Sequence, residues 1–331
     1  MSIHFTVPLG LRALVSHEVA RPFPKKGGKA MAPKRLMTTD GSGDWVTPYP
    51  ASPSIHLILK TRMFRSTLVA TGVGDNPVWV ERLKEGWETK VIELLDSISN
   101  GTWTQKIVMA AIKRRCAEKG YEVVIYPREY HPKNTPSKGL NELEVIDQYL
   151  NSAADGNTRG GTSVPPDGET AFIYFDPDPW RADSFMRQEA AIMNPAKFGG
   201  VGMEPRDVLF HELVHALRRL KGVTDRTPTT TRDYVNLEEF SAVLVTNIAI
   251  SETNQFAPLR YGERTFIAMP AQYKTSAGFL GNPENADLVK RIIARDFILP
   301  REIANSPTPN PFNPFRRSLR GALWAAPRAD W

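Results

Sequence analysis

Apolar residues recur at helical spacing in several stretches of the chain. In residues 81–98, Leu83, Trp87, Val91 and Leu94 lie three or four residues apart, which predicts an amphipathic helix. Similar patterns predict helices over residues 104–120, 205–221, 236–252 and 285–297. Runs with strand character cover residues 55–60, 65–73, 121–127 and the start of 171–180. Helices and strands are mixed, and helices dominate the C-terminal half, so the predicted fold class is α+β.

The regions outside these elements are rich in turn-forming residues. Residues 1–54 hold much Pro, Gly, Lys and Ser and are predicted to be a basic, partly flexible leader. Residues 301–331 are rich in Pro and are predicted to be an extended or irregular tail. The predicted domain organisation is therefore a leader, one domain over residues 55–300, and a tail.

The predicted helix over residues 205–221 has clear boundary signals. Pro205 suits the first turn, and Asp207 favours the positive N-terminal end. Gly222 suits the position just past the end. Arg218 and Arg219 favour the negative C-terminal end, and we expect both on a solvated face.

This helix carries the pattern His-Glu-x-x-His, from His211 to His215. Residues four apart lie one above the other on one helix face, so both imidazoles can bind one ion. Glu212 is offset around the helix, close to that ion without ligating it. Zinc hydrolases use this geometry. Burying a histidine pair among apolar neighbours is costly unless the pair is satisfied, and a metal satisfies it. We therefore predict Zn²⁺ at His211 and His215, with Glu212 as the general base that accepts a proton from water.

A catalytic zinc ion usually has three protein ligands and one water. No histidine follows His215, so the third ligand is predicted to be a carboxylate on the helix over residues 236–252. Glu238 and Glu239 are adjacent there and point about 100° apart, so only one can face the metal. Ala242, three residues after Glu239, would allow close helix packing and slightly favours Glu239. Glu238 remains the alternative ligand.

Other polar residues have two interpretations each. Tyr234 could donate a hydrogen bond to the oxyanion of the substrate, or it could simply pack at the start of a helix. Asp176 and Asp178 could hydrogen-bond a ligating imidazole, but a turn at the end of a strand explains them equally well.

Composition and charge limit the function classes further. Hydrophobic residues make up 41% and charged residues 24% of the chain, as in soluble globular proteins. No apolar run approaches the ~18 residues that span a membrane, and no cleavable signal peptide is recognisable. A single cysteine, Cys116, excludes an intrachain disulfide and a thiolate-only zinc cluster. The net charge of +6 is concentrated in the leader, but no nucleic-acid-binding motif accompanies it, so no specific nucleic-acid partner is expected.

Two motifs resemble a known family when taken together. The segment "HELVHALR" from His211 is followed by "EEFSAVLVTNIAISE" from Glu238, and "AFIYFDPDPW" precedes both. This order is similar to bacterial effector zinc metallopeptidases of the NleD type and to metallopeptidase extensions of type VI secretion spike proteins. The resemblance covers roughly residues 85–265. It departs at Leu244, where the family often has Gly.

The resemblance implies a zincin-like (gluzincin) fold with an active-site helix, a second ligand-bearing helix and a small sheet. It also makes Glu239 the better third ligand, because in the family the position after the Phe of this motif, Phe240 here, can be bulky. The implied function is a zinc metalloendopeptidase, secreted without a cleavable signal, that acts as an effector or toxin on a protein or peptide in a target cell. A secretion apparatus or an immunity protein would be its partner. The alternatives are a peptidoglycan-directed zinc amidase or peptidase, and a non-catalytic binding or adaptor protein stabilised by zinc.

Overall fold

The chain divides into two units, residues 1–32 and 33–331, and every residue described below belongs to the second. The computed structural model describes residues 34–36, 44–60, 86–126, 170–184, 200–231, 233–263, 266–310 and 312–323, together with residues 187, 188, 191, 192 and 194. Within these residues the fold is α+β, as predicted. None of the described helices is long and apolar enough to cross a membrane.

A mixed five-stranded sheet has the strand order β1-β2-β3-β4-β5. Its strands are β1 (Lys34–Leu36), β2 (Asp44–Tyr49), β3 (Ser52–Lys60), β4 (Glu122–Tyr126) and β5 (Thr170–Tyr174). The first three strands pair antiparallel and the last three pair parallel. The strands predicted over residues 55–60, 121–127 and the start of 171–180 are confirmed, whereas residues 65–73 lie outside the described residues. After β5 comes a short 3₁₀ helix, η3 (Asp178–Trp180).

Part of the predicted leader belongs to this sheet. β2 pairs with β3, and Tyr49 at its end is fully buried. The Tyr49 hydroxyl donates to Asp96 Oδ1 at 2.7 Å, so the strand is held against helix α3 (Trp87–Ser99). The sequence of β2 is polar and contains Pro, so it shows no strand pattern by itself. The strand forms because it pairs with β3, which follows after a turn.

Helix α4 (Trp103–Lys119) follows α3, as the apolar spacing predicted. Thr102 and Gln105 form a reciprocal capping box at its start, and Gly120 ends it with a φ of 71°. Both signals satisfy backbone groups that the helix itself leaves unpaired. Cys116 near its end is buried.

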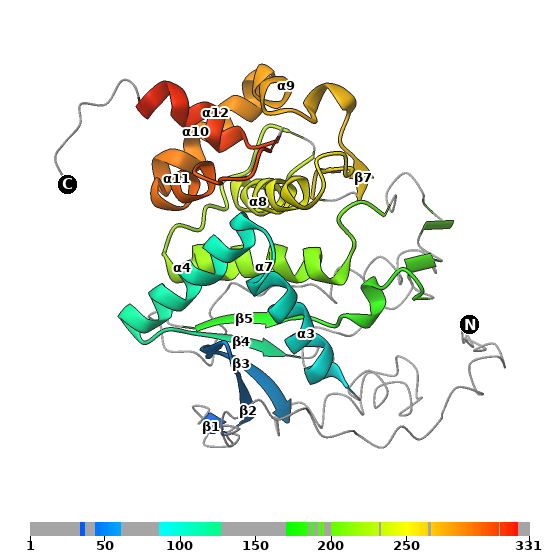
Figure 1. Ribbon diagram of the computed structural model, residues 1–331, viewed down its shortest axis with the longest axis vertical. Helices are drawn as coiled ribbons and strands as arrows, with labels where there is room; N and C mark the ends of the chain where they lie inside the picture. The colour runs from blue at the N-terminus through cyan, green and yellow to red at the C-terminus, as the bar shows by residue number, and fades with distance from the viewer. Residues whose placement is uncertain are drawn as a thin grey trace. The chain divides into compact units, whose positions relative to one another are not determined.

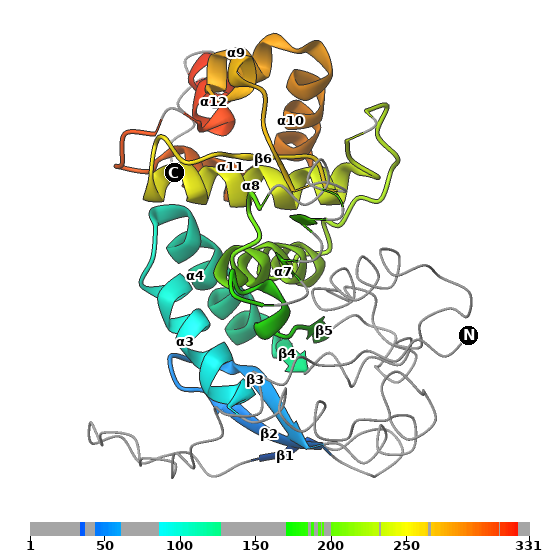
Figure 2. The ribbon, with the colours of Figure 1, turned by 90° about the vertical axis from the view of Figure 1, so that its right-hand side faces the viewer.

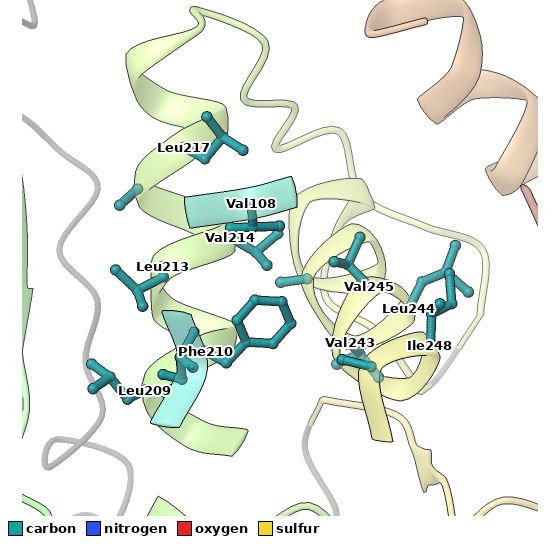
Figure 3. Packing of buried hydrophobic residues seen from close by; sticks show 14 of the residues in the cluster. Val108, Leu209, Phe210, Leu213, Val214, Leu217, Val243, Leu244, Val245 and Ile248 are labelled. Atoms are coloured by element: carbon teal, nitrogen blue, oxygen red, sulfur yellow. The ribbon is translucent and has the colours of Figure 1, made fainter. Parts of the chain in front are cut away.

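Helix α7 (Pro205–Leu220) contacts β5 and α8 (Leu237–Thr253), and in Figure 1 it lies between the sheet and α8. Its predicted boundaries are confirmed: Pro205 is in the first turn, and Gly222 just past the end has a φ of 68°. In Figure 3, Phe210 points from α7 toward α8, while Leu209 and Leu213 project from other sides of α7. Because α7 is enclosed on most sides, nearly all its residues are buried.

Four more of the described helices lie on the side of α8 away from the sheet (Figure 2). They are α9 (Ser276–Gly281), α10 (Pro283–Arg295), α11 (Ile298–Ala304) and α12 (Pro314–Leu323), and α10 contacts α8 directly. The expectation of extended or irregular chain after residue 300 is therefore wrong for α11 and α12. Asn313 Oδ1 accepts from the Arg316 backbone N–H and starts α12, and Phe315 and Leu319 are buried. Of the described prolines after residue 304, Pro307 and Pro309 lie between α11 and α12 and Pro314 is the first residue of α12, where the missing N–H is harmless.

A small hairpin joins α8 to this helical layer. Its strands β6 (Arg260–Tyr261) and β7 (Ile267–Ala268) pair antiparallel, and the 3₁₀ helix η4 (Ala271–Tyr273) follows. No sequence pattern predicted this hairpin, because each strand has only two residues.

Candidate metal centre

One atom from each of three side chains converges beside α7. His211 Nε2 lies 3.1 Å from His215 Nε2, and Glu239 Oε2 lies 3.2 Å from His215 Nε2 and 3.4 Å from His211 Nε2. The histidines come from successive turns of α7, and the glutamate comes from the first turn of α8. These three residues could hold a metal ion.

The spacing of these atoms fits a small tetrahedral ion. Ligand atoms ~2.0–2.1 Å from such an ion are about 3.3–3.4 Å apart, close to the three measured separations. The 3.1 Å between the two Nε2 atoms suits either one shared proton or one cation held by both lone pairs. The donor set, two imidazoles and one carboxylate, therefore suits a divalent cation.

A fixed hydrogen bond prepares His215 for this role. Its Nδ1 lies 3.2 Å from Glu238 Oε1, and because a carboxylate only accepts, Nδ1 carries the proton. When Nε2 is deprotonated, the ring presents its lone pair to the cluster. This is the carboxylate–histidine arrangement that orients metal ligands in proteins.

The ionisation of the cluster follows from burial and charge. Burial lowers the pKa of His211 to about 4. Burial also opposes protonation of His215, but the carboxylates of Glu239 and Glu238 raise its pKa well above the ordinary value. Burial would raise the pKa of Glu239, yet His215 and His211 hold it well below the ordinary value. The cluster thus attracts one positive charge, and a metal cation can replace the proton.

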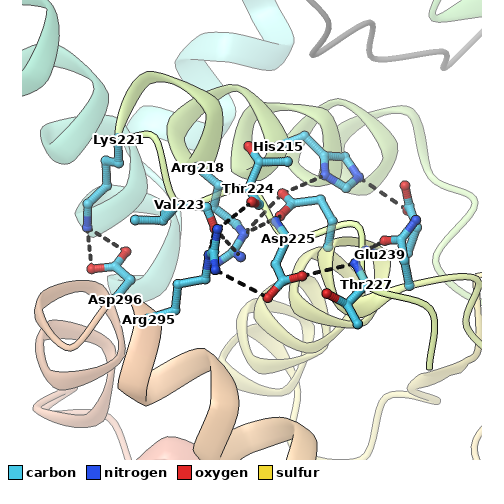
Figure 4. A network of polar contacts seen from close by, with 12 residues as sticks. His215, Arg218, Lys221, Val223, Thr224, Asp225, Thr227, Glu239, Arg295 and Asp296 are labelled. Carbon is cyan, nitrogen blue, oxygen red and sulfur yellow. Dashed lines mark hydrogen bonds and ion pairs between the residues drawn. The ribbon is translucent and has the colours of Figure 1, made fainter. Parts of the chain in front are cut away.

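Figure 4 shows a polar network that includes His215, Arg218 and Asp225, and Glu238 belongs to this network through its contact with His215 Nδ1. Its carboxylate accepts from Arg218 Nε at 2.9 and 3.0 Å and from the Asp225 backbone N–H at 3.1 Å. Burial alone would raise the pKa of Glu238, but His215 and Arg218 bring it below the ordinary value. The expectation that Arg218 is solvated is wrong, because it is 1% exposed; Arg219 is half-buried.

The two neighbouring glutamates therefore have different positions. Glu239 Oε2 is within 3.4 Å of both Nε2 atoms, whereas Glu238 contacts only the opposite nitrogen of His215. Asn236 helps to fix this orientation, because its side chain accepts from the Glu239 backbone N–H and starts α8. Of the two alternatives that the sequence left open, the geometry places Glu239 with the histidine pair.

Glu212 is 5% exposed and lies on α7 between the two histidines. Its negative charge helps to raise the pKa of His215, so the carboxylate is near the cluster. It is not one of the converging ligand groups. This position matches the expected offset from the metal ligands.

The other polar residues singled out in the sequence lie elsewhere. Asp178 accepts both its hydrogen bonds from Lys90 Nζ, at 2.8 and 2.9 Å. Asp176 is buried but does not bond the ligand histidines, since His215 Nδ1 is on Glu238 and His211 Nδ1 has no partner among the described residues. Neither aspartate therefore orients an imidazole in this structure.

Tyr234 is 5% exposed, and its ring packs edge-on against Phe240 with centroids 4.9 Å apart. Its hydroxyl accepts a hydrogen bond from the Gly262 backbone, and burial raises its pKa. This environment is that of a packed tyrosine at a helix start. Its predicted role as an oxyanion donor stays a prediction.

Sequence reasoning missed one charged residue of the site. The positive charge of Arg260 helps to lower the pKa of His211. The negative charges of Glu239 and Glu212 in turn act to raise the pKa of Arg260. Arg260 has no motif around it. The one available signal was Asn247, a polar residue within the apolar run of α8, which holds the Arg260 backbone.

Comparison with models of known families finds no match to this chain. Comparisons with curated proteins and with solved structures find no significant match either. The resemblance to NleD-type effector peptidases thus rests on the two helical motifs.

Proposed function

We propose that this chain is a zinc-dependent metalloendopeptidase with a zincin-like (gluzincin) domain. One observation carries the proposal: single atoms of His211, His215 and Glu239 lie within 3.4 Å of one another. Two histidines and a glutamate are the ligand set of zinc peptidases that keep a fourth position for water or substrate. Structural zinc sites instead have four protein ligands, and only three donor groups converge among the described residues.

Each residue has a defined part in the hydrolysis. Zinc, when bound, is a Lewis acid that lowers the pKa of a coordinated water toward about 7. Glu212 accepts the proton of the attacking water and later gives it to the leaving amine. Glu238 fixes the tautomer and orientation of His215 through Nδ1.

The biological setting is proposed from the resemblance of the motifs. We propose that the protein is secreted by a bacterium and cleaves a protein or peptide in a target cell, as effector peptidases of the NleD type do. Cleavage of peptidoglycan crosslinks is the competing assignment, since the same ligand set can serve either substrate.

The variant Glu212→Gln tests the proposed mechanism. We expect about one zinc per chain by mass spectrometry in both wild type and variant, and loss of hydrolysis in the variant alone. Glu204→Gln is a matched control: Glu204 precedes the same helix and pairs with Arg187. The substrates are a denatured protein and purified peptidoglycan, assayed in parallel.

The outcomes separate the assignments. Cleavage of the denatured protein supports the endopeptidase, and cleavage of peptidoglycan alone supports the competing amidase. Full activity in Glu212→Gln, or absence of bound zinc in the active wild type, would overturn the mechanism.

A further inference from the structure

The segment from Arg260 to Glu263 is held along helix α8 at two levels. The side chain of Asn247 accepts from the Arg260 backbone N–H at 2.9 Å and donates to its carbonyl at 2.8 Å. Further along, the Glu263 backbone N–H donates to Asp233 O at 2.8 Å, and Glu263 Oε2 accepts from the Val235 backbone at 2.9 Å. The segment thus runs from the middle of α8 back to its N-terminal end, where Glu239 lies.

The Arg260 side chain follows the same direction. Its guanidinium donates through Nη2 to the carbonyl of Glu263, so it lies at the level of the first turn of α8. The Cζ atom is 4.1 Å from the centroid of the Phe266 ring, a cation–π contact that supports the charge from one side.

Gly202 leaves room for the stem of this arginine. A Cβ atom at Gly202 would lie 3.4 Å from Arg260 Cδ and 3.5 Å from Arg260 Cβ, and the glycine has a φ of 69°. Gly202, which lies shortly before α7, and the hairpin that follows α8 therefore meet at Arg260. Its side chain is fixed from three sides before any substrate binds.

Arg260, whose charge interacts with Glu239 and His211, retains an unused donor. Its Nε atom is buried and has no hydrogen-bond partner among the described residues. Burial lowers the pKa of Arg260 to about 10, with Glu239 and Glu263 acting in the opposite direction, so the guanidinium is charged at neutral pH. A buried donor without a partner is unfavourable, which suggests that a ligand supplies the acceptor.

We propose that Arg260 binds the carbonyl oxygen of the scissile peptide bond and stabilises the oxyanion that forms there. This proposal rests on the proposed peptidase function. As the water oxygen bonds to the carbonyl carbon, the π electrons move onto the carbonyl oxygen and Glu212 takes the water proton. The carbonyl then re-forms, the C–N bond breaks, and the amine nitrogen receives the proton from Glu212. Arg260 keeps its own proton throughout and donates a charge-assisted hydrogen bond to the oxyanion.

The proposal assigns to Arg260 the task that sequence reasoning gave to Tyr234. The Tyr234 hydroxyl already accepts from the backbone of Gly262, within the same segment. Its contact helps to hold the segment that carries Arg260. In this proposal the tyrosine is a positioning residue, and the arginine touches the substrate.

The variants Arg260→Met and Arg260→Lys test this role. Methionine keeps an apolar stem over Phe266 without the donor, and lysine keeps the charge without the planar fork. Arg115→Met is the matched control, because Arg115 also has an aromatic contact, with Tyr121, and a backbone hydrogen bond, with Leu220, at the far end of α7. Zinc content, kcat and KM on the substrate cleaved by the wild type, and affinity for an N-phosphoryl-leucyl-tryptophan probe are measured for each. The phosphoryl group mimics the tetrahedral anion.

For Arg260→Met we expect unchanged zinc content, a kcat about 10²–10³-fold lower, and little change in KM. The affinity for the phosphoryl probe should fall with kcat, and added guanidinium ion should restore part of the activity. Arg260→Lys should fall between wild type and Arg260→Met. Arg115→Met should keep wild-type kcat.

Two results would overturn the role of Arg260: a wild-type kcat in zinc-loaded Arg260→Met, or a loss of activity fully explained by lost zinc. If Arg260→Met does not fold, the kcat of Arg260→Lys and its affinity for the phosphoryl probe test the role of Arg260 instead. A wild type that hydrolyses nothing contradicts the proposed function. In that case the probe still decides the role of Arg260: equal affinity in wild type and variant overturns it.

Discussion

Glu238 and Glu239 follow one another in the sequence and lie on opposite sides of the His215 ring. The side chain of Glu238 is 3% exposed and has three fixed partners, His215, Arg218 and the Asp225 backbone. The side chain of Glu239 is 25% exposed and lies beside the two Nε2 atoms. The inner carboxylate is satisfied by the protein, whereas the outer one still attracts a cation. One histidine ring therefore separates a structural network from a binding site.

The largest expected effect is on the outer side. Replacing Glu239 by Ala removes one of three ligands, and we expect zinc affinity to fall on the order of 10³-fold, about 4 kcal/mol. Glu252→Ala is the control, since Glu252 lies on the same helix and accepts from the Thr104 backbone away from the cluster. Competition with a chromogenic chelator measures both. Wild-type affinity in Glu239→Ala would contradict its role as ligand.

On the inner side, Arg218→Met should chiefly lower stability. It leaves the Glu238 carboxylate buried without its cation, and breaking such a pair costs about 3–5 kcal/mol. Urea unfolding of the metal-free protein measures this effect. Arg219→Met, one residue further and half-buried, should change the free energy of unfolding by roughly 1 kcal/mol or less. Equal effects from the two variants would show that the Arg218–Glu238 pair adds nothing specific.

Glu238→Gln should have an intermediate effect on the metal. The amide can still accept from His215 Nδ1, but it lacks the charge that strengthens this bond, so zinc affinity should fall about 10–100-fold. The same chelator competition measures it. A loss of about 10³-fold in Glu238→Gln, on the order expected for a lost ligand, together with wild-type affinity in Glu239→Ala would mean that Glu238, and not Glu239, is the metal ligand.

The smallest effect is expected at the rim of the inner network. The Asp225 side chain accepts from the Thr227 backbone N–H at 2.9 Å and pairs with Arg295 at 3.6 Å. Asp225→Ala keeps the backbone N–H that Glu238 uses. We expect the free energy of unfolding to fall by about 1 kcal/mol or less, with zinc affinity close to wild type. A tenfold loss of zinc affinity would show that the loop side chains also position His215.

Local signals predicted the helices that carry the site. Pro205 and Gly222 marked the ends of α7, and apolar spacing located α3, α4, α8 and α10. The same reasoning failed where a residue's environment comes from a distant segment. Arg218 was expected on a solvated face, but it donates to Glu238 and to the carbonyl of Val223 and is buried. The Pro-rich end was expected to be irregular, yet α12 packs on α9 and α11.

The sequence alone determined that His211, Glu212 and His215 share one helix and that both imidazoles project from one face, because a four-residue spacing returns after about one helical turn. The tertiary structure decided which glutamate joins them. The crossing of α7 and α8 and the Asn236 cap set the rotation of α8, and neither is encoded in the spacing of Glu238 and Glu239. Only folding also brings Arg260 to the cluster, because Asn247 and Asp233 hold its segment along α8 through contacts between residues far apart in the chain.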